Sequence, residues 1–255
     1  MSERRLDRLN GWGFRSGGFD KAVLAVGSTE YHGDHLPYGT DTMVAQHLAE
    51  EVARRVEGLL VLPPLPYGMS LHYASFPVAV SLTTGTLMRV LREVFDSLLG
   101  HGIVRLLVVN GHDGNMAAIE SAAREFRVEH PEMRIAVLEA WWVTAAELVP
   151  EGTFEVWGGL GHAGEGETSM MLAVAPELVD MGRARGVVPE LPAHVQVKWI
   201  FDELTPYGVT GDPTRATREK GKTMRDALVK LLVSFIEEMD IRNWKWENTK
   251  IRESI

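Results

Sequence analysis

The sequence predicts an α/β fold with an open, mostly parallel β-sheet and helices on both of its faces. Between residues 21 and 139, short apolar runs alternate with longer stretches in which apolar residues recur at helical spacing. This alternation is typical of parallel strands that are joined by helical crossovers. Two of the apolar runs lead directly into polar loops. Ligands in such folds bind beyond the carboxyl ends of the strands, so these loops are the first place to look for a site.

The elements of the predicted sheet follow in a regular order. Strands are expected over residues 21–26, 59–62, 103–109 and 134–138, and helices are expected over residues 41–56, 84–101 and 116–130. Gly58 and Gly102 follow the first two helices and end them, as glycine commonly does at a helix C-terminus. Residues 78–82 are expected to form one more short strand.

The flanking segments are less regular. Residues 1–20 are charged and glycine-rich and are expected to form an irregular lead-in. The segment that starts at Trp141 and leads to the glycine-rich stretch is expected to be less regular, and residues 180–213 are expected to form loops over the surface. Two further helices are expected, over residues 168–175 and 215–239.

We expect one domain over residues 1–255, because the sequence shows no internal repeat and no convincing linker. The charged tail from residue 244 to residue 255 is expected to be mobile. The beginning of the chain lacks an apolar signal region, and no apolar run approaches the length of a membrane span. A soluble, cytoplasmic protein is therefore the default expectation.

Charge and composition narrow the possible functions. The net charge of −9 argues against non-specific binding to nucleic acid and against binding to an anionic membrane surface. There is no cysteine, so any metal site must use histidine, aspartate and glutamate. The absence of cysteine also excludes a thiol nucleophile, and no Gly-x-Ser-x-Gly motif indicates a serine hydrolase.

Polar side chains that can bind metals are concentrated in the loop of residues 27–41. Glu30, His32, His35 and Asp41 lie within twelve residues of one another. Carboxylates and imidazoles are the usual ligands of zinc and manganese when thiolates are absent. In an extended segment the side chains of Glu30 and His32 project to one side, and Asp41 is able to fold back towards them. The alternative is a polar turn in which Asp41 only caps the following helix.

A second candidate lies in residues 110–115, directly after the predicted strand 103–109. His112 is flanked by glycine and is expected at the crevice beyond the strand rather than in the core. The alternative is a turn histidine that bonds to the backbone. Asp113 is adjacent and acidic, but it points elsewhere if the backbone is extended.

The third candidate is the glycine-rich segment of residues 158–169. Its glycine spacing does not match the dinucleotide-binding fingerprint, and its two glutamates would repel phosphate. His162 is suited to proton transfer, because the ordinary pKa of histidine lies near neutrality. Glu167 is expected in the first turn of the following helix, where the helix dipole would stabilise it even without a function.

The long loop of residues 65–76 supplies candidates for a substrate pocket. Loops of this length in compact domains are usually functional or disordered, and the aromatic content here argues against disorder. Ser70 and His72 are the residues of this loop that we expect to face a substrate.

The three polar segments resemble the signature of the creatininase family of metal-dependent hydrolases. The matching motifs are Gly27–Asp41, Asn110–Asn115 and His162–Ser169, and with their flanks they cover the chain from about residue 21 to residue 176. The resemblance implies a three-layer α/β/α sandwich around a mostly parallel sheet. It also implies two divalent metal ions per chain, with zinc, manganese or iron as the metal, and a homo-oligomer, usually a hexamer.

The resemblance also assigns roles to residues. The metal ligands carried over by position are Glu30, His32, Asp41 and His112, with Asp41 bridging both ions. Creatininase itself has a further glutamate ligand two residues after the histidine of the second motif, where this chain has Gly114. Glu167 is the candidate to replace this absent metal ligand, and it is also a candidate catalytic residue. His162 matches the catalytic histidine of the family. The substrate is expected to contact Tyr31, Ser70, His72 and Asp113.

The implied reaction is hydrolysis by water that two metal ions activate, with His162 protonating the leaving nitrogen. The expected substrate is a small polar amide or formamide, as for a creatininase-like amidohydrolase or a formamidopyrimidine nucleotide deformylase; a cyclic amide fits best. Tyr31 stands where glutamine is common, and residues 76–79 depart from the usual Phe-Pro-Gly-Thr, so creatinine itself is doubtful. Family members also cleave a modified peptide. The alternatives are carbon–carbon ring opening of a cyclic inositol-derived ketone and, in another class, a non-catalytic metal- or ligand-binding protein.

Overall fold

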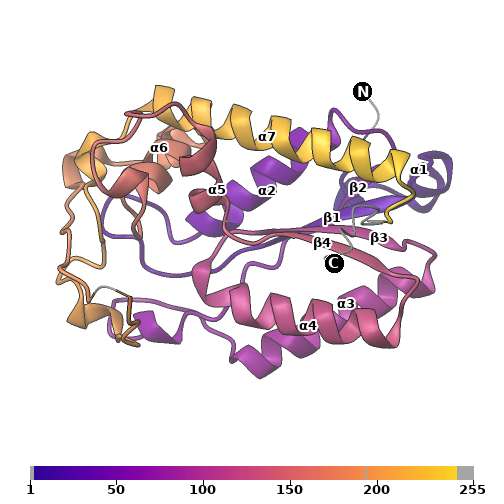
Figure 1. The fold of residues 1–255 in the computed structure, drawn as a ribbon, viewed down its shortest axis with the longest axis horizontal. Helices are drawn as coiled ribbons and strands as arrows, with labels where there is room; N and C mark the ends of the chain where they lie inside the picture. The colour runs from indigo at the N-terminus through magenta and orange to yellow at the C-terminus, as the bar shows by residue number, and fades with distance from the viewer. Residues whose placement is uncertain (1–2, 193, 246–255) are drawn as a thin grey trace, which may run out of the picture.

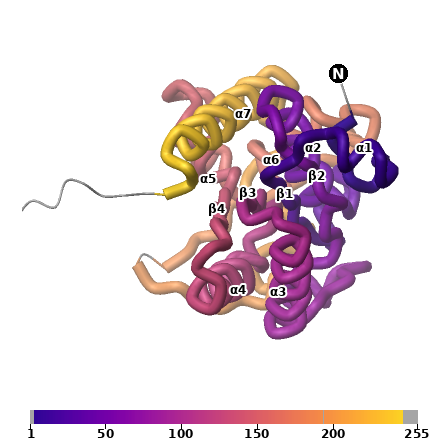
Figure 2. Tube along the Cα trace, turned by 90° about the vertical axis from the view of Figure 1, so that its right-hand side faces the viewer, coloured from indigo at the N-terminus to yellow at the C-terminus, as the bar shows by residue number. Residues whose placement is uncertain are grey.

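The computed structural model describes residues 3–192 and 194–245, and it confirms the predicted α/β class (Figure 1). The strands of the sheet are all parallel and lie in the order β2-β1-β3-β4. Their bounds are Lys21–Val26 for β1, Leu59–Val61 for β2, Arg105–Asn110 for β3 and Arg134–Leu138 for β4. The helices cover both faces of this sheet and complete a three-layer sandwich (Figure 2).

The helices divide into two layers. The longer helices are α2 (Thr40–Ala53), α3 (Thr84–Gly100), α4 (Met116–Glu129), α5 (Trp141–Leu148), α6 (Glu165–Val174) and α7 (Arg218–Ile241). Helices α3 and α4 pack against each other below the sheet as Figure 1 shows it, and α2, α5, α6 and α7 lie above it. The ends of the predicted strands and helices differ from the observed ends by no more than three residues.

The central strand β1 explains why both layers are needed. Its residues are all buried, which is typical of a parallel strand that is covered on both faces. Val23 and Ala25 belong to the core on the α2 and α7 side. Ala22, Leu24 and Val26 belong to the core on the α3 and α4 side. This alternation follows from the two-residue period of a β-strand.

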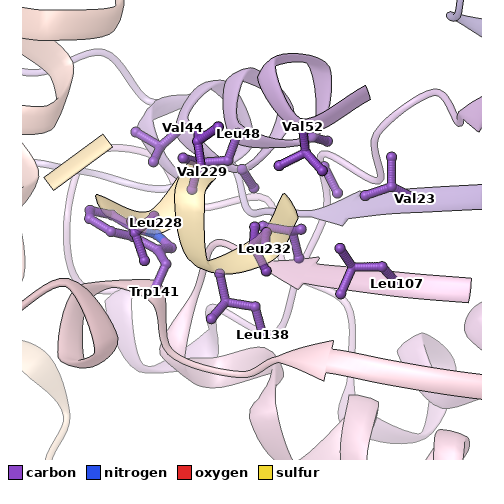
Figure 3. Packing of buried hydrophobic residues seen from close by; sticks show 14 of the residues in the cluster. Val23, Val44, Leu48, Val52, Leu107, Leu138, Trp141, Leu228, Val229 and Leu232 are labelled. Atoms are coloured by element: carbon purple, nitrogen blue, oxygen red, sulfur yellow. The ribbon is translucent and has the colours of Figure 1, made fainter. Parts of the chain in front are cut away.

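The core above the sheet is built around α7. In Figure 3 the side chains of Leu228, Val229 and Leu232 lie among residues of α2, of the sheet and of the segment after β4. Trp141, which is 1% exposed, belongs to the same cluster. The core therefore ties the C-terminal helix to the sheet that carries the polar loops.

The topology opens a crevice between β1 and β3. These strands are neighbours, and Val26 pairs with Asn110 at their carboxyl ends. After β1 the chain continues through α2 on one face, and after β3 it continues through α4 on the other face. Loops that leave on opposite sides of such a point leave a crevice between them. The prediction that residues 27–41 and 110–115 lie at one edge of the sheet is confirmed.

Several expected elements are wrong. Residues 78–82 do not form a strand, because the pairing there is limited to a single bridge between Thr29 and Val80. The lead-in contains the helix α1, Gly11–Ser16, in which the Asn10 side chain accepts a hydrogen bond from the Gly13 N–H. The segment that starts at Trp141, for which no helix was expected, forms α5. Its consecutive apolar residues hide the helical period.

The predicted start of the mobile tail, at residue 244, is wrong, because Trp244 packs in the core. Trp244 is 2% exposed, belongs to the core cluster and lies edge-on to Phe235, with 6.3 Å between the ring centroids. The rest of the expected tail, from residue 246 onwards, lies outside the described residues. Among the helices that the structure describes, none combines the length and the apolarity required to cross a lipid bilayer.

The packing of α6 on α7 generates a stability prediction. A Cβ atom at Gly221 in α7 would overlap the carbonyl oxygen of Ser169 in α6, whereas a Cβ atom at Gly100 in α3 meets nothing within 4 Å. Gly221→Ala should lower the free energy of unfolding by about 1–3 kcal/mol. Gly100→Ala, the same change in another helix, should leave it unchanged or raise it by up to about 1 kcal/mol. Urea unfolding measures both, and equal effects would contradict the close approach of the two helices.

Candidate functional site

The loops after β1 and β3 bring carboxylates and imidazoles together at the carboxyl edge of the sheet. Glu30, Asp41 and His112 offer ligand atoms that all lie within 4.8 Å of one another, and so do Glu30, His32 and His162. The two groups share Glu30. The sequence separates these residues by up to 132 positions, and the topology of the sheet brings them into one cluster.

Asp41 lies between two imidazoles. Its Oδ1 is 2.9 Å from Nε2 of His32, and its Oδ2 is 3.3 Å from Nδ1 of His112. The Ser28 hydroxyl donates a further hydrogen bond to Oδ2 at 2.6 Å. Burial by itself raises the pKa of Asp41, but His32 and His112 outweigh burial and hold the pKa well below its ordinary value. Gly39 occupies the N-cap of α2, so the interpretation of Asp41 as a mere helix cap is wrong.

The two histidines beside Asp41 are oriented by backbone carbonyls. Nδ1 of His32 lies 3.1 Å from the Glu30 carbonyl oxygen, and Nε2 of His112 lies 3.0 Å from the Met69 carbonyl oxygen. An imidazole that donates one N–H to a carbonyl presents its other nitrogen to a cation, which is the usual arrangement of a metal-binding histidine. Here both remaining nitrogens face Asp41.

The same histidines carry raised pKa values. Burial lowers the pKa of His32, but Asp41, Glu167 and Glu30 outweigh it and raise the pKa to about 10. Burial also lowers the pKa of His112, and Glu30 and Asp41 raise it to about 9. The carboxylates thus create a field that attracts positive charge at this edge of the sheet.

The surroundings of Glu30 favour the binding of a cation more clearly than those of the other side chains in the cluster. It is 0% exposed, and neither of its carboxylate oxygens has a hydrogen-bond partner. Its Oε2 lies 3.2 Å from Nε2 of His112, but that nitrogen bonds to the Met69 carbonyl. Burial raises the pKa of Glu30, because a buried carboxylate without a hydrogen bond is costly to ionise. A bound divalent cation would remove this cost, so the residues present fit a metal site.

Glu167 approaches the cluster from α6. It lies in the first turn of that helix, and its Oε2 is 3.9 Å from Nε2 of His32. The same oxygen accepts a hydrogen bond from the Ala163 N–H at 2.6 Å. Burial raises the pKa of Glu167 to about 7. Glu167 and Asp41 therefore both face Nε2 of His32, the ring nitrogen that does not bond to the Glu30 carbonyl.

Gly114 lies where a glutamate side chain has no room. A Cβ atom at this position would overlap the Met69 carbonyl oxygen and lie 2.6 Å from Nε2 of His112. The loop that carries Met69 is held there by Asn115, whose side-chain oxygen accepts a hydrogen bond from the Met69 N–H at 3.0 Å. The backbone at Met69 thus occupies the space beside His112, and Glu167 brings a carboxylate within 3.9 Å of His32 from a different element.

His162 adjoins the cluster with a defined tautomer. Its Nε2 donates a hydrogen bond to the Tyr31 carbonyl at 2.7 Å, and its Nδ1 lies 3.7 Å from Oε1 of Glu30. Burial lowers the pKa of His162 well below its ordinary value, and the neighbouring His32 lowers it further. The imidazole is therefore neutral, and the lone pair of Nδ1 faces the carboxylates.

The residues expected to line a substrate pocket divide into two groups. Ser70 and His72 lie beside His112: the Ser70 hydroxyl is 3.4 Å from its Nε2, and the His72 ring is nearly parallel to its ring at 5.9 Å. The Tyr31 ring stacks on Phe76 at 5.3 Å. Asp113, in contrast, is exposed, and the structure does not bring it into the buried cluster.

Two aromatic residues that the sequence analysis did not select lie against His162. The Tyr73 ring is 4.5 Å from the His162 ring, and the Phe201 ring is 5.1 Å from it. The rings of Tyr73 and Phe201 are 4.4 Å apart. Tyr73 belongs to the aromatic loop beside His72, which was a usable signal. Phe201 lies in a segment without regular pattern, and nothing in the sequence indicates its position.

The model of the creatininase family, described as creatinine amidohydrolase, matches residues 15–236. Among curated relatives, a mycofactocin precursor peptide peptidase from Mycobacterium ulcerans is 33% identical over 84% of this chain and 83% of its own length. A creatinine amidohydrolase from Pseudomonas putida is 32% identical over 85% of this chain and 88% of its own length. A 3-dehydro-scyllo-inosose hydrolase from Thermotoga maritima is 27% identical over 86% of this chain and 78% of its own length.

Solved structures agree with the sequence relatives. A putative creatinine amidohydrolase from Bacteroides fragilis superimposes with a TM-score of 0.82 at 30% identity and covers 94% of this chain and 97% of that one. Two creatininase structures, one described as Mn and one, a variant, as Zn-Zn type, both superimpose with a TM-score of 0.78. They are 28% and 29% identical to this chain. The superpositions cover 92% and 93% of this chain and 98% of each creatininase chain. The chain therefore belongs to the creatininase family of metal-dependent hydrolases.

Proposed function

We propose that the chain holds two divalent metal ions and hydrolyses the C–N bond of a small polar amide or formamide, with a cyclic amide as the best-fitting substrate. The observation that carries this proposal is the buried, unpartnered carboxylate of Glu30 in a cluster of carboxylates and imidazoles. The donor set contains oxygen and nitrogen but no thiolate, which suits zinc or manganese. The creatininase structures described as Zn-Zn type and as Mn support the same choice.

The arrangement of side chains supports two neighbouring metal positions. Glu30, Asp41 and His112 would hold one ion, since their ligand atoms already converge. His32, Asp41 and Glu167 would hold the other, since both carboxylates face Nε2 of His32. Asp41 belongs to both sets because each of its oxygens faces a different imidazole.

When bound, two such ions supply a nucleophile at neutral pH by lowering the pKa of water, and they polarise a carbonyl group. The protein must then move protons. His162 is neutral, so it acts first as a base at Nδ1 and only afterwards as an acid. The Tyr31 carbonyl, bonded to Nε2–H, holds the ring in this tautomer throughout. His162 thus takes a proton from water at Nδ1 and then, as the general acid, donates this proton to the leaving nitrogen.

The exposure of the cluster supports a compact substrate. The side chains of His32, Glu30, Asp41 and His112 are 0–3% exposed, whereas those of His162 and Glu167 are 10% and 12% exposed. The opening therefore lies beside His162 and Glu167. The rings of Tyr73 and Phe201 border this side. A small planar amide fits such an opening better than the middle of an extended peptide does.

The relatives define the competing substrates. The mycofactocin precursor peptide peptidase supports a peptide bond as an alternative, and the inosose hydrolase supports the alternative of carbon–carbon cleavage of a cyclic ketone. Zinc-loaded and manganese-loaded protein can be assayed with a panel of cyclic amides, formamides, short peptides and cyclic ketones. The substrates that are turned over then distinguish the proposed substrate class from these alternatives. Turnover confined to peptides or to ketones would replace the proposed substrate class. Metal binding without any turnover would instead favour a binding protein on the same fold.

Metal analysis of purified protein tests the cluster directly. The parent chain should hold about two ions, and His112→Ala should lose at least one of them, because His112 supplies an imidazole that faces Asp41 and Glu30. His101→Ala, an exposed histidine at the end of α3, is the matched control and should retain the parent content. Equal metal content in both variants would remove His112 from the ligand set.

The role of Glu167 has its own test. Glu167→Gln keeps the shape of the side chain but removes the charge that faces His32, so the metal content should fall from about two ions to about one per chain. Glu177→Gln changes an exposed glutamate just beyond α6 and should have no effect. Inductively coupled plasma mass spectrometry measures the content. Retention of both ions in Glu167→Gln would mean that Glu167 is not the replacement for the ligand absent at Gly114.

Replacement of His162 should separate catalysis from metal binding. His162→Asn should retain the metal ions but lower kcat by roughly 10²–10⁴, the range expected for loss of a general acid–base. The rate is measured with the substrate of the panel that is turned over fastest. Loss of metal in this variant would instead identify His162 as a ligand, as its place beside Glu30 and His32 allows.

A further inference from the structure

The phenol of Tyr73 is a buried polar group that the proposed function does not yet use. Tyr73 ends the short 3₁₀-helix of residues 71–73, and it is 4% exposed. Its ring is 4.5 Å from His162, 4.4 Å from Phe201 and 4.3 Å from His72. Rings from three separate segments therefore fix its position at the opening of the cluster.

The hydroxyl of Tyr73 has no partner within the described part of the chain. Although the residue as a whole is only 4% exposed, its hydroxyl oxygen is not fully enclosed, so a group that enters the site can reach it. The carboxylates of Glu30, Glu167, Asp41 and Asp113 all act electrostatically on this phenol. Its ring lies 4.5 Å from the His162 ring and 6.2 Å from the His112 ring, so the phenol adjoins the cluster with its donor capacity free.

A phenol has an ordinary pKa near 10 and keeps its proton at neutral pH. Burial, and after it the surrounding carboxylates, raise the pKa of Tyr73 well above its ordinary value, so the phenol acts as a donor. The group that it can serve must be an acceptor that is present only when substrate is bound. In amide hydrolysis that acceptor is the carbonyl oxygen, which gains negative charge as water attacks.

We propose that the Tyr73 hydroxyl donates a hydrogen bond to the reacting carbonyl oxygen of the substrate and is a catalytic residue of the hydrolysis, an inference that rests on the function proposed above. As the bond from water to the carbonyl carbon forms, the π electrons of the carbonyl move onto this oxygen. Tyr73 stabilises that charge and keeps its proton. When the carbonyl re-forms, the C–N bond breaks and the nitrogen takes the proton carried by His162.

The change Tyr73→Phe removes the hydroxyl and preserves the ring contacts with His162 and Phe201. We expect kcat for the fastest substrate of the panel to fall roughly 10²–10³-fold, as for loss of one donor to an oxyanion, with KM changed much less. A purely structural role of the ring predicts no change in either constant. Tyr67→Phe, an exposed tyrosine in the same loop, is the matched control.

Binding of acetohydroxamate to metal-loaded protein supplies a second readout that does not depend on turnover. The inhibitor presents a charged oxygen next to the ions, and Tyr73→Phe should weaken its Kd about tenfold in calorimetry, the equivalent of one hydrogen bond. The metal content and Tm of the variant should equal those of the parent.

The outcomes distinguish the two proposals. Parent-like kcat and parent-like hydroxamate affinity in Tyr73→Phe, with the metal ions retained, would overturn the role of Tyr73 and leave the proposed hydrolysis standing. A parent chain that binds neither metal nor acetohydroxamate would overturn the proposed function and this role together. An equal loss in Tyr67→Phe would also overturn it, since that hydroxyl is remote from the cluster.

Discussion

The burial of several carboxylates beside imidazoles, at the carboxyl ends of β1 and β3, is the constraint on which the site depends. Like charges at close range in a region without water repel one another, and each loses the hydration that it has in solution. Glu30 bears this cost most fully, since it is wholly buried and makes no hydrogen bond. Two imidazoles aimed at Asp41 offset part of the charge. Divalent cations would offset the rest, and so the polar cluster and the metal-dependent chemistry have one physical origin.

The surroundings of the cluster hold it in place against this cost. Asn110, at the end of β3, donates hydrogen bonds to the carbonyls of His112 and Glu139. Asn115, which follows β3, donates a hydrogen bond to the Gly27 carbonyl after β1 and accepts one from the Met69 N–H after β2. The loop at Met69, which follows β2, fills the space beside Gly114. Because these contacts join segments that leave different strands, the geometry of the cluster depends on the sheet being correctly assembled.

The mouth of the cluster has a different chemical character from its floor. The floor consists of charged groups, whereas the rings of Tyr73, Phe201 and His72 form the wall beside His162. Aromatic walls exclude water and strengthen every electrostatic interaction inside. They also restrict which substrates enter. Relatives named for a peptide, for creatinine and for an inosose belong to the same family, so the fold by itself does not determine the substrate.

The sequence alone determined the alternation of strands and helices and the identity of Glu30, Asp41 and His112 as candidate ligands, because periodicity and loop composition are local properties. It failed at α1 and α5, where short length or uninterrupted apolar residues hide the helical period. The family resemblance already named Glu167, and only the tertiary structure placed its carboxylate 3.9 Å from His32 and brought the surrounding rings together. Glu167 and Phe201 lie far along the chain from Glu30, and their approach depends on how α6 and an irregular segment pack, which no local pattern encodes.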